Sequence, residues 1–196
     1  LLGRSGMGHG RVHWSGNFDE IQDFELDIRN AFGGSGFISG AVNSSLGAAN
    51  GGRSADLDAM AAYVSSLTTI PKSPYRNADG SMTTSATAGA AHFTSKGCAV
   101  CHSGTQFTDS NTNVLHNIGT INTASGKRLN ATLTGIDTPT LRGIWSTAPY
   151  LHRGQAVDLP AVFNTTNAPG TTNHARFREL TTGQQTELIN YLLELE

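Results

Sequence analysis

The sequence predicts a mostly α-helical protein with long irregular connections. Two stretches, Ser54 to Leu67 and Thr181 to Leu195, carry apolar residues at the spacing of amphipathic helices. Glycine accounts for 23 of the 196 residues, and serine, threonine and asparagine are abundant, so much of the backbone is expected in loops. Hydrophobic residues make up only 37% of the chain, so the side chains alone would form a modest core.

Both cysteines of the chain are separated by two residues, and a histidine directly follows the second. This C-x-x-C-H stretch is typical of a c-type haem attachment site. Cys98 and Cys101 would form thioethers with two vinyl groups of one porphyrin, and His102 would be the proximal iron ligand. One covalent haem c would also supply apolar mass that the side chains lack.

Other interpretations of the two cysteines match the sequence less well. A zinc site needs two more ligands at paired spacing, and there is no second C-x-x-C. A redox dithiol is typical of a strand-to-helix junction, whereas the flanks here hold Gly, Ser and Thr. A disulfide between residues this close has poor geometry. The alternatives to haem are therefore a dithiol or a metal site.

The first part of the chain reads as two helices and a loop. The stretch from Phe18 to Arg29 mixes an apolar stripe with acids and predicts a short helix, whose acids are interpreted as a solvated face rather than a metal or partner site. Residues 33–53 form a Gly-rich loop, and the helix at 54–67 follows. A linker at 68–84, with prolines and an Asn-Ala-Asp-Gly turn, places a domain boundary near residue 76.

The second part reads as three helices around a long irregular segment. Residues 86–95 predict a helix that leads into the C-x-x-C-H stretch. Residues 105–138 look irregular, and a loop of this length is expected to wrap a ligand such as a haem edge. Pro160 suits the first turn of a helix from Leu159 to Asn164, and Thr182 with Gln185 offers a capping box for the last helix.

One unit is repeated within the chain. The segment from Gly8 to Gly16 parallels the segment from Ala148 to Gly154, with His13 opposite His152, and the two amphipathic helices parallel each other at their ends. The first copy begins inside the unit, without the C-x-x-C-H half. We therefore expect residues 1–76 to be the remnant of a first domain and residues 77–196 to be a complete second domain.

Several motifs together resemble the di-haem cytochrome c peroxidase family, which includes MauG-like methylamine-utilisation enzymes. They are the C-x-x-C-H stretch, the segments at 114–120, 137–143 and 148–154, and the closing helix. The resemblance implies a cytochrome c-like fold, here one haem domain preceded by a truncated pseudo-repeat. Calcium at the domain interface is compatible with the resemblance, although no EF-hand loop is present. The family's peroxidatic haem belongs to the N-terminal domain, which here has no C-x-x-C-H.

The resemblance also directs the search for the sixth iron ligand. The family takes a Met from the helix after the Tyr-x-His-x-Gly turn, and the helix at 159–164 has none. We expect His174, in a Pro-Gly-x-x-x-His stretch after that helix, to be the ligand, with His116 as the second candidate and Met82 as the only Met in this domain. Further candidates for haem contacts are Arg142, as a bidentate propionate partner, and Tyr150.

The composition limits the partners. A net charge of −2 without a basic run argues against nucleic acid, and no apolar stretch is long enough to span a membrane. Because thioethers form after export, a haem c implies a periplasmic or cell-surface location. The sequence thus predicts a bis-His c-type cytochrome that passes electrons between redox proteins or haem subunits, within a larger chain or complex. The alternatives are part of a di-haem peroxidase or oxygenase, whose catalytic haem lies on a missing N-terminal portion, and a redox-inert assembly subunit.

Overall fold

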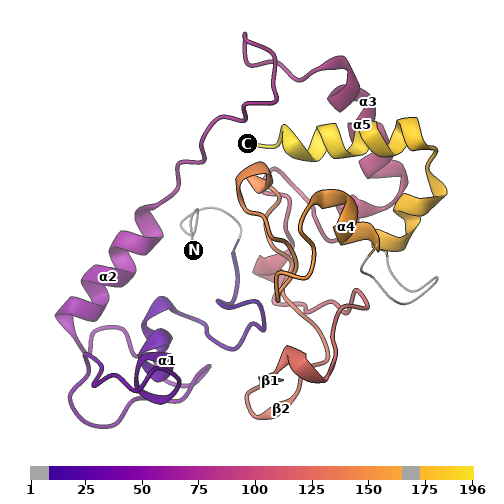
Figure 1. Cartoon of the computed structure of the whole chain (residues 1–196). Coiled ribbons are helices and arrows are strands. Elements are labelled where there is room, and N and C mark those ends of the chain that lie inside the picture. Colours follow the sequence, from indigo (N-terminus) through magenta and orange to yellow (C-terminus); the bar gives the residue numbers. More distant parts are fainter. Residues whose placement is uncertain (1–8, 165–172) are drawn as a thin grey trace.

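The computed structural model describes residues 9–164 and 173–196, and within them helices and irregular segments predominate (Figure 1). The α-helices are α1 (Phe24–Asn30), α2 (Ala55–Ser66), α3 (Thr84–Ser95), α4 (Leu159–Asn164) and α5 (Thr182–Leu193). Single 3-10 turns lie at Ile21–Asp23, Cys98–Val100, Ser110–Thr112, Thr123–Ser125 and Ile144–Ser146, and a longer 3-10 segment lies at Asn173–Glu179. Two short antiparallel strands, β1 (Lys127–Arg128) and β2 (Ala131–Thr132), interrupt the irregular segment. The predicted mostly helical, loop-rich class is confirmed.

Helices α3 and α5 pack against each other in the second part of the chain (Figure 1). Their backbones approach most closely at Gly89, where a Cβ atom would lie 2.0 Å from the carbonyl oxygen of Glu187 and 2.8 Å from the Cβ of Tyr191. Only glycine fits this approach. The helix pair holds the apolar side chains of α5, including Leu188 and Leu192, against the cavity described below.

Helix α5 begins one residue earlier than its predicted capping box. The side chain of Thr181 accepts a hydrogen bond from the backbone N–H of Gln184, and the Gln184 side chain accepts one from the backbone N–H of Thr181. The capping box is therefore Thr181 with Gln184, rather than Thr182 with Gln185. Thr181 has the extended backbone that an N-cap requires, whereas Thr182 is already helical.

Two acids of the first helical region, Asp23 and Glu25, are buried, which corrects the sequence-based interpretation of a solvated face for these two, whereas Asp19 is exposed. The side chain of Glu25 is fully buried; it accepts hydrogen bonds from the backbone N–H groups of Phe37 and Ile38 and pairs with Arg29 at 2.8 Å. Asp23 is 1% exposed and accepts a hydrogen bond from the side-chain amide of Asn50. These carboxylates hold the long glycine-rich loop in place.

Buried apolar residues form two separate clusters. The first contains Val12, Phe18, Ile21 and Ala61, all from the first part of the chain. The second comes from the second part and contains Ala86, Phe93, Leu141, Leu159, Phe163, Phe177, Leu180, Leu188, Tyr191, Leu192 and Leu195. The connecting segment is fixed to the C-terminal end, because Ser73 Oγ donates to the carbonyl oxygen of Leu193 and Arg76 Nε donates to that of Glu194.

Two turns, one in each part of the chain, have the same backbone geometry. An antiparallel bridge closes each turn, between Val12 and Phe18 in the first and between Tyr150 and Ala156 in the second. In each, the residue after the first bridge position has a positive φ, and a positive-φ glycine follows three residues later. The match pairs Trp14 with His152, so it shifts the sequence-based alignment of His13 with His152 by one residue.

Candidate haem site

The C-x-x-C-H stretch follows directly from the end of α3. Gly97 has a φ of +75°, which ends the helix in the left-handed conformation that favours glycine. The chain then makes a 3-10 turn at Cys98–Val100, and the N–H of His102 donates to the carbonyl oxygen of Cys98. This helical backbone brings the two cysteines and the histidine to one side of the turn.

His102 is oriented by the irregular segment that follows it. Its Nδ1 lies 3.1 Å from the carbonyl oxygen of Phe107, which can only accept a hydrogen bond, so Nδ1 carries the proton. The other ring nitrogen, Nε2, then has the free lone pair that a metal ligand needs. Phe107 itself has a φ of +51°, so the carbonyl that orients His102 belongs to an uncommon backbone conformation.

The structure brings His174 to His102 from the far end of the domain. Their ring centroids lie 6.3 Å apart, with the ring planes 18° apart. His174 belongs to the 3-10 segment at Asn173–Glu179 and lies edge-to-face against Phe163, with the centroids 5.8 Å apart. Its Nδ1 is buried and has no hydrogen-bond partner among the described residues.

Both imidazoles are held in the neutral form. Burial lowers the pKa of His102, and burial together with the neighbouring His102 lowers the pKa of His174 to about 4. Neutral imidazole is the form that binds metal ions. At neutral pH the two rings are therefore available as ligands without first losing a proton.

A cavity of about 880 Å³ surrounds this pair. Six of the seven histidines of the chain line it, and the seventh, His92, forms an ion pair with Glu187. The lining histidines are His9, His13, His102, His116, His152 and His174. Much of the remaining lining is apolar and comes from α3, α4, α5 and the segment at 136–151, so the cavity suits a large, flat, mainly apolar group with axial nitrogen ligands.

The two thiols have the properties of anchors rather than of a reactive dithiol. No disulfide joins them, and burial raises the pKa of Cys98 to about 11. Burial, and next the charge of Asp109, raise the pKa of Cys101. Reactive dithiols need a lowered pKa, so the redox-dithiol interpretation is disfavoured.

A zinc site formed by the two cysteines is not supported either. His9 and His13 have the spacing of a zinc-ligand pair and line the cavity. Over residues 9–164 and 173–196, however, the one group of three metal-ligating side chains is Cys101, Asp109 and His116. No group contains both cysteines, which a tetrahedral zinc site on this motif would require.

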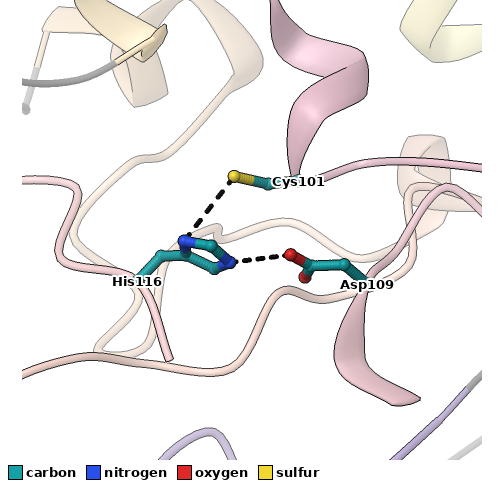
Figure 2. A group of neighbouring side chains, drawn as sticks. All are labelled: Cys101, Asp109 and His116. Carbon is teal, nitrogen blue, oxygen red and sulfur yellow. Dashed lines mark hydrogen bonds and ion pairs between the residues drawn. The ribbon is translucent and has the colours of Figure 1, made fainter. Parts of the chain in front are cut away.

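Cys101, His116 and Asp109 lie together beside the attachment turn (Figure 2). The Nδ1 atom of His116 lies 3.7 Å from the sulfur of Cys101, and its Nε2 lies 2.7 Å from an oxygen of Asp109. His116 is fixed by two backbone hydrogen bonds with Ile136, of 2.8 and 2.9 Å. The second ligand candidate is thus occupied on both nitrogens, by a thiol and by a carboxylate.

The other predicted contacts have different outcomes. Tyr150 lines the cavity, but its hydroxyl donates to the carbonyl oxygen of Ile144 at 3.0 Å. Arg142 does not line the cavity, and its Nη1 donates to the side chain of Gln106 at 2.9 Å. Met82 packs against the second apolar cluster and is likewise not in the cavity lining.

Trp14 is a cavity residue that the sequence did not single out. Its indole lies against the ring of His152, with the centroids 5.1 Å apart, and the backbone N–H of Asp137 donates to its carbonyl oxygen. The segment around Trp14 therefore forms a wall of the cavity, although it comes from the first part of the chain. The parallel between the turn that contains Trp14 and the turn that contains His152 is the sequence signal that could have identified Trp14.

Comparisons with known proteins find similarity to cytochrome c-like proteins. The family model "RoxA-like, cytochrome c-like" matches residues 135–171. Hydrazine synthase subunit gamma of Kuenenia stuttgartiensis is 29% identical over 180 residues, which cover 71% of this chain and 48% of that protein. The chain therefore spans about half the length of this relative.

Two solved structures have a similar fold. Hydrazine synthase of Kuenenia stuttgartiensis, pressurised with 20 bar of xenon, matches 98% of this chain and 70% of its own, with a TM-score of 0.67 and 24% identity. A MauG-like protein associated with microbial copper homeostasis matches 96% of this chain and 70% of its own, with a TM-score of 0.59 and 18% identity. The resemblance to cytochromes c and MauG-like proteins is confirmed, and residues 135–171 match a cytochrome c-like family model.

Proposed function

We propose that this chain carries electrons through one covalently bound haem c, with Cys98 and Cys101 as thioether anchors and His102 and His174 as axial ligands. A haem with two strong axial imidazoles supplies outer-sphere electron transfer, because neither face has an open position for peroxide or oxygen. The side chains around it bind the group, fix both imidazoles and exclude water.

The separation of the two histidine rings is the observation that carries this proposal. Two metal–nitrogen bonds of about 2 Å, with about 1.1 Å more from each nitrogen to its ring centre, require centroids roughly 6.3 Å apart. The rings of His102 and His174 lie 6.3 Å apart and both line the cavity. The residues present therefore fit a haem with two histidine ligands.

The chain contributes to this role through orientation and burial. The carbonyl of Phe107 fixes the tautomer of His102, and Phe163 supports His174. The apolar residues of α5 and α4 close one side of the cavity and keep water away from both rings. A ligand pair that is already placed and neutral needs little rearrangement when the iron changes charge.

The test is a measurement of haem content and peroxide reactivity on the purified, exported protein. We expect an intact mass with one covalent haem and a ferric absorption spectrum that peroxide does not change. The His174→Ala variant should keep the covalent haem but react with peroxide. If peroxide changes the ferric spectrum of the wild-type protein, and that protein contains no second haem, the carrier role is contradicted.

A second candidate function is part of a di-haem peroxidase or oxygenase. The observation in its favour is the repeated turn: the Trp14 turn has the geometry of the His152 turn and its indole lies against His152. An upstream C-x-x-C-H in a longer chain, together with peroxide turnover by that longer chain, would favour this candidate.

The partners and location follow from the same argument. Because the relative is named as a subunit and the chain spans half of it, we propose that this domain works within a larger chain or complex, beside redox proteins or other haem subunits. No helix in the described part of the chain is long and apolar enough to cross a membrane. Thioether attachment places the protein in the periplasm or at the cell surface.

A further inference from the structure

The hydrogen bonds that join Cys101, His116 and Asp109 have a defined direction (Figure 2). Asp109 accepts a hydrogen bond from Nε2 of His116, so Nε2 carries the ring proton. Nδ1 therefore has the lone pair, and it faces the sulfur of Cys101 at 3.7 Å, where it can accept the thiol hydrogen. The imidazole thus places a proton acceptor against the sulfur of Cys101, and the carboxylate lies on the other side of the ring.

The three side chains lie close together, and one ligand atom from each lies within 4.8 Å of the others. The carboxylate of Asp109 and the sulfur of Cys101 contact opposite nitrogens of the same ring. The ring of His116 can therefore accept the thiol proton at Nδ1 while the carboxylate of Asp109 holds its other nitrogen.

The two cysteines differ in this respect. Among the described residues, Cys98 has no imidazole or carboxylate hydrogen-bond partner, and it packs against the apolar cluster of the second part of the chain. The sulfur of Cys101 faces the ring of His116. Two backbone hydrogen bonds between His116 and Ile136 hold that ring in place before any ligand is bound. The anchoring reaction should therefore depend on His116 at one cysteine only.

We propose that His116 accepts the thiol proton of Cys101 while the thioether to a vinyl-bearing tetrapyrrole forms, and that Asp109 is the positioning residue for His116. The sulfur bonds to the inner vinyl carbon as the π bond breaks. The proton passes from the sulfur to Nδ1 and then to the outer vinyl carbon, so the thiol adds across the double bond and no oxidant or reductant is consumed. This inference rests on the proposed haem attachment.

The test uses the full chain, exported by a host that attaches haem. Wild type is compared with His116→Ala, His116→Gln and Asp109→Asn, where Gln keeps the size and the hydrogen bonding of the ring but is not a base. The control is His92→Ala, because His92 also binds a carboxylate at 2.7 Å but lies outside the cavity lining. Free thiols in the haem-containing fraction are alkylated after denaturation and assigned by peptide mass.

We expect the wild type and His92→Ala to show almost no alkylation. Both His116 variants should carry haem on Cys98, with alkylated Cys101 in an at least several-fold higher fraction, and Asp109→Asn should lie between. Equal thioether formation at Cys101 in all variants, or equal loss at both cysteines, would overturn the inference. Wild-type protein with no covalent haem would instead overturn the proposed function.

Discussion

The ring of His174 lies 6.3 Å from the ring of His102, centroid to centroid, and the two planes differ by 18°. The two residues come from opposite ends of the second part of the chain and meet in a cavity that other histidines and apolar side chains line. Burial keeps both rings neutral by lowering their pKa values. The pair therefore has the separation and the protonation state of two ligands to one metal ion.

Replacing His174 by Met should raise the reduction potential. A thioether sixth ligand favours the reduced iron more than an imidazole does, and we expect a rise of about 0.1–0.2 V within the roughly 0.8 V over which axial ligands set haem potentials. Potentiometric titration of the purified protein measures it. His92→Met is the matched control, and an unchanged potential in His174→Met would argue against ligation by His174.

Removing the Tyr150 hydroxyl should affect stability and leave the haem unchanged. The hydroxyl donates to the carbonyl oxygen of Ile144 at 3.0 Å, so Tyr150→Phe should cost about 1 kcal/mol of the free energy of unfolding. Denaturant titration and the ferric absorption spectrum check the two expectations. A spectral shift without a loss of stability would mean that the hydroxyl contacts the haem instead.

Glu25 should be essential for the stability of the first part of the chain. Glu25→Ala would leave the backbone N–H groups of Phe37 and Ile38 and the Arg29 guanidinium without their buried acceptor, and we expect a loss of about 3 kcal/mol. Denaturant unfolding measures this loss. The exposed pair of Lys96 with Glu179 is the control, since Glu179→Ala should change stability by no more than about 0.5 kcal/mol.

Glu25 also predicts a dependence of stability on pH. Burial alone would raise its pKa, but hydrogen bonds from Ile38, Phe37 and Arg29 outweigh burial and lower the pKa below its usual value. A carboxylate with a lowered pKa stabilises the fold above the pKa of the unfolded chain, and this contribution is lost as the pH falls through the folded pKa. Unfolding curves between neutral and acidic pH should therefore show a steeper loss for the wild type than for Glu25→Gln. Parallel curves would contradict it.

The contact between α3 and α5 should not tolerate a side chain at Gly89. A Cβ there would lie 2.0 Å from the carbonyl oxygen of Glu187, so Gly89→Ala should cost about 1–3 kcal/mol through overpacking. Gly183, in the first turn of α5, has open space within 4 Å of the position that a Cβ would take, and Gly183→Ala should stabilise by up to about 1 kcal/mol. Thermal unfolding of both variants distinguishes the two effects, and equal effects would mean that the helices are further apart.

Local patterns predicted the helices and the attachment turn well. Helix α4 has the predicted bounds, and helix α2 (Ala55–Ser66) lies within the predicted stretch from Ser54 to Leu67, with Ser54 as its N-cap. The C-x-x-C-H spacing is a local property, because it needs only one turn of backbone. The meeting of His174 with His102 depended on the resemblance to a family, because spacing along the chain does not say which loops fold together.

Tertiary contacts account for what the sequence did not predict. Glu25 and Asp23 were interpreted as part of a solvated face because acidic side chains are usually exposed. Their partners, the backbone N–H of Phe37 and the side-chain amide of Asn50, lie in a loop that reaches them only in the folded chain. The sequence suggested that the two turns align with His13 opposite His152. The positive-φ positions of the two turns instead place Trp14 opposite His152. The group of Cys101, His116 and Asp109 joins three segments that no periodicity connects.

The central claim, that His102 and His174 are both axial ligands, is tested most directly by the electron paramagnetic resonance spectrum of the ferric protein before and after His174→Ala. We predict a low-spin bis-imidazole signal in the wild type and in the His92→Ala control. The His174→Ala variant should become high-spin, because one axial position opens. A high-spin wild-type signal, or a low-spin signal that survives His174→Ala unchanged, would contradict the account.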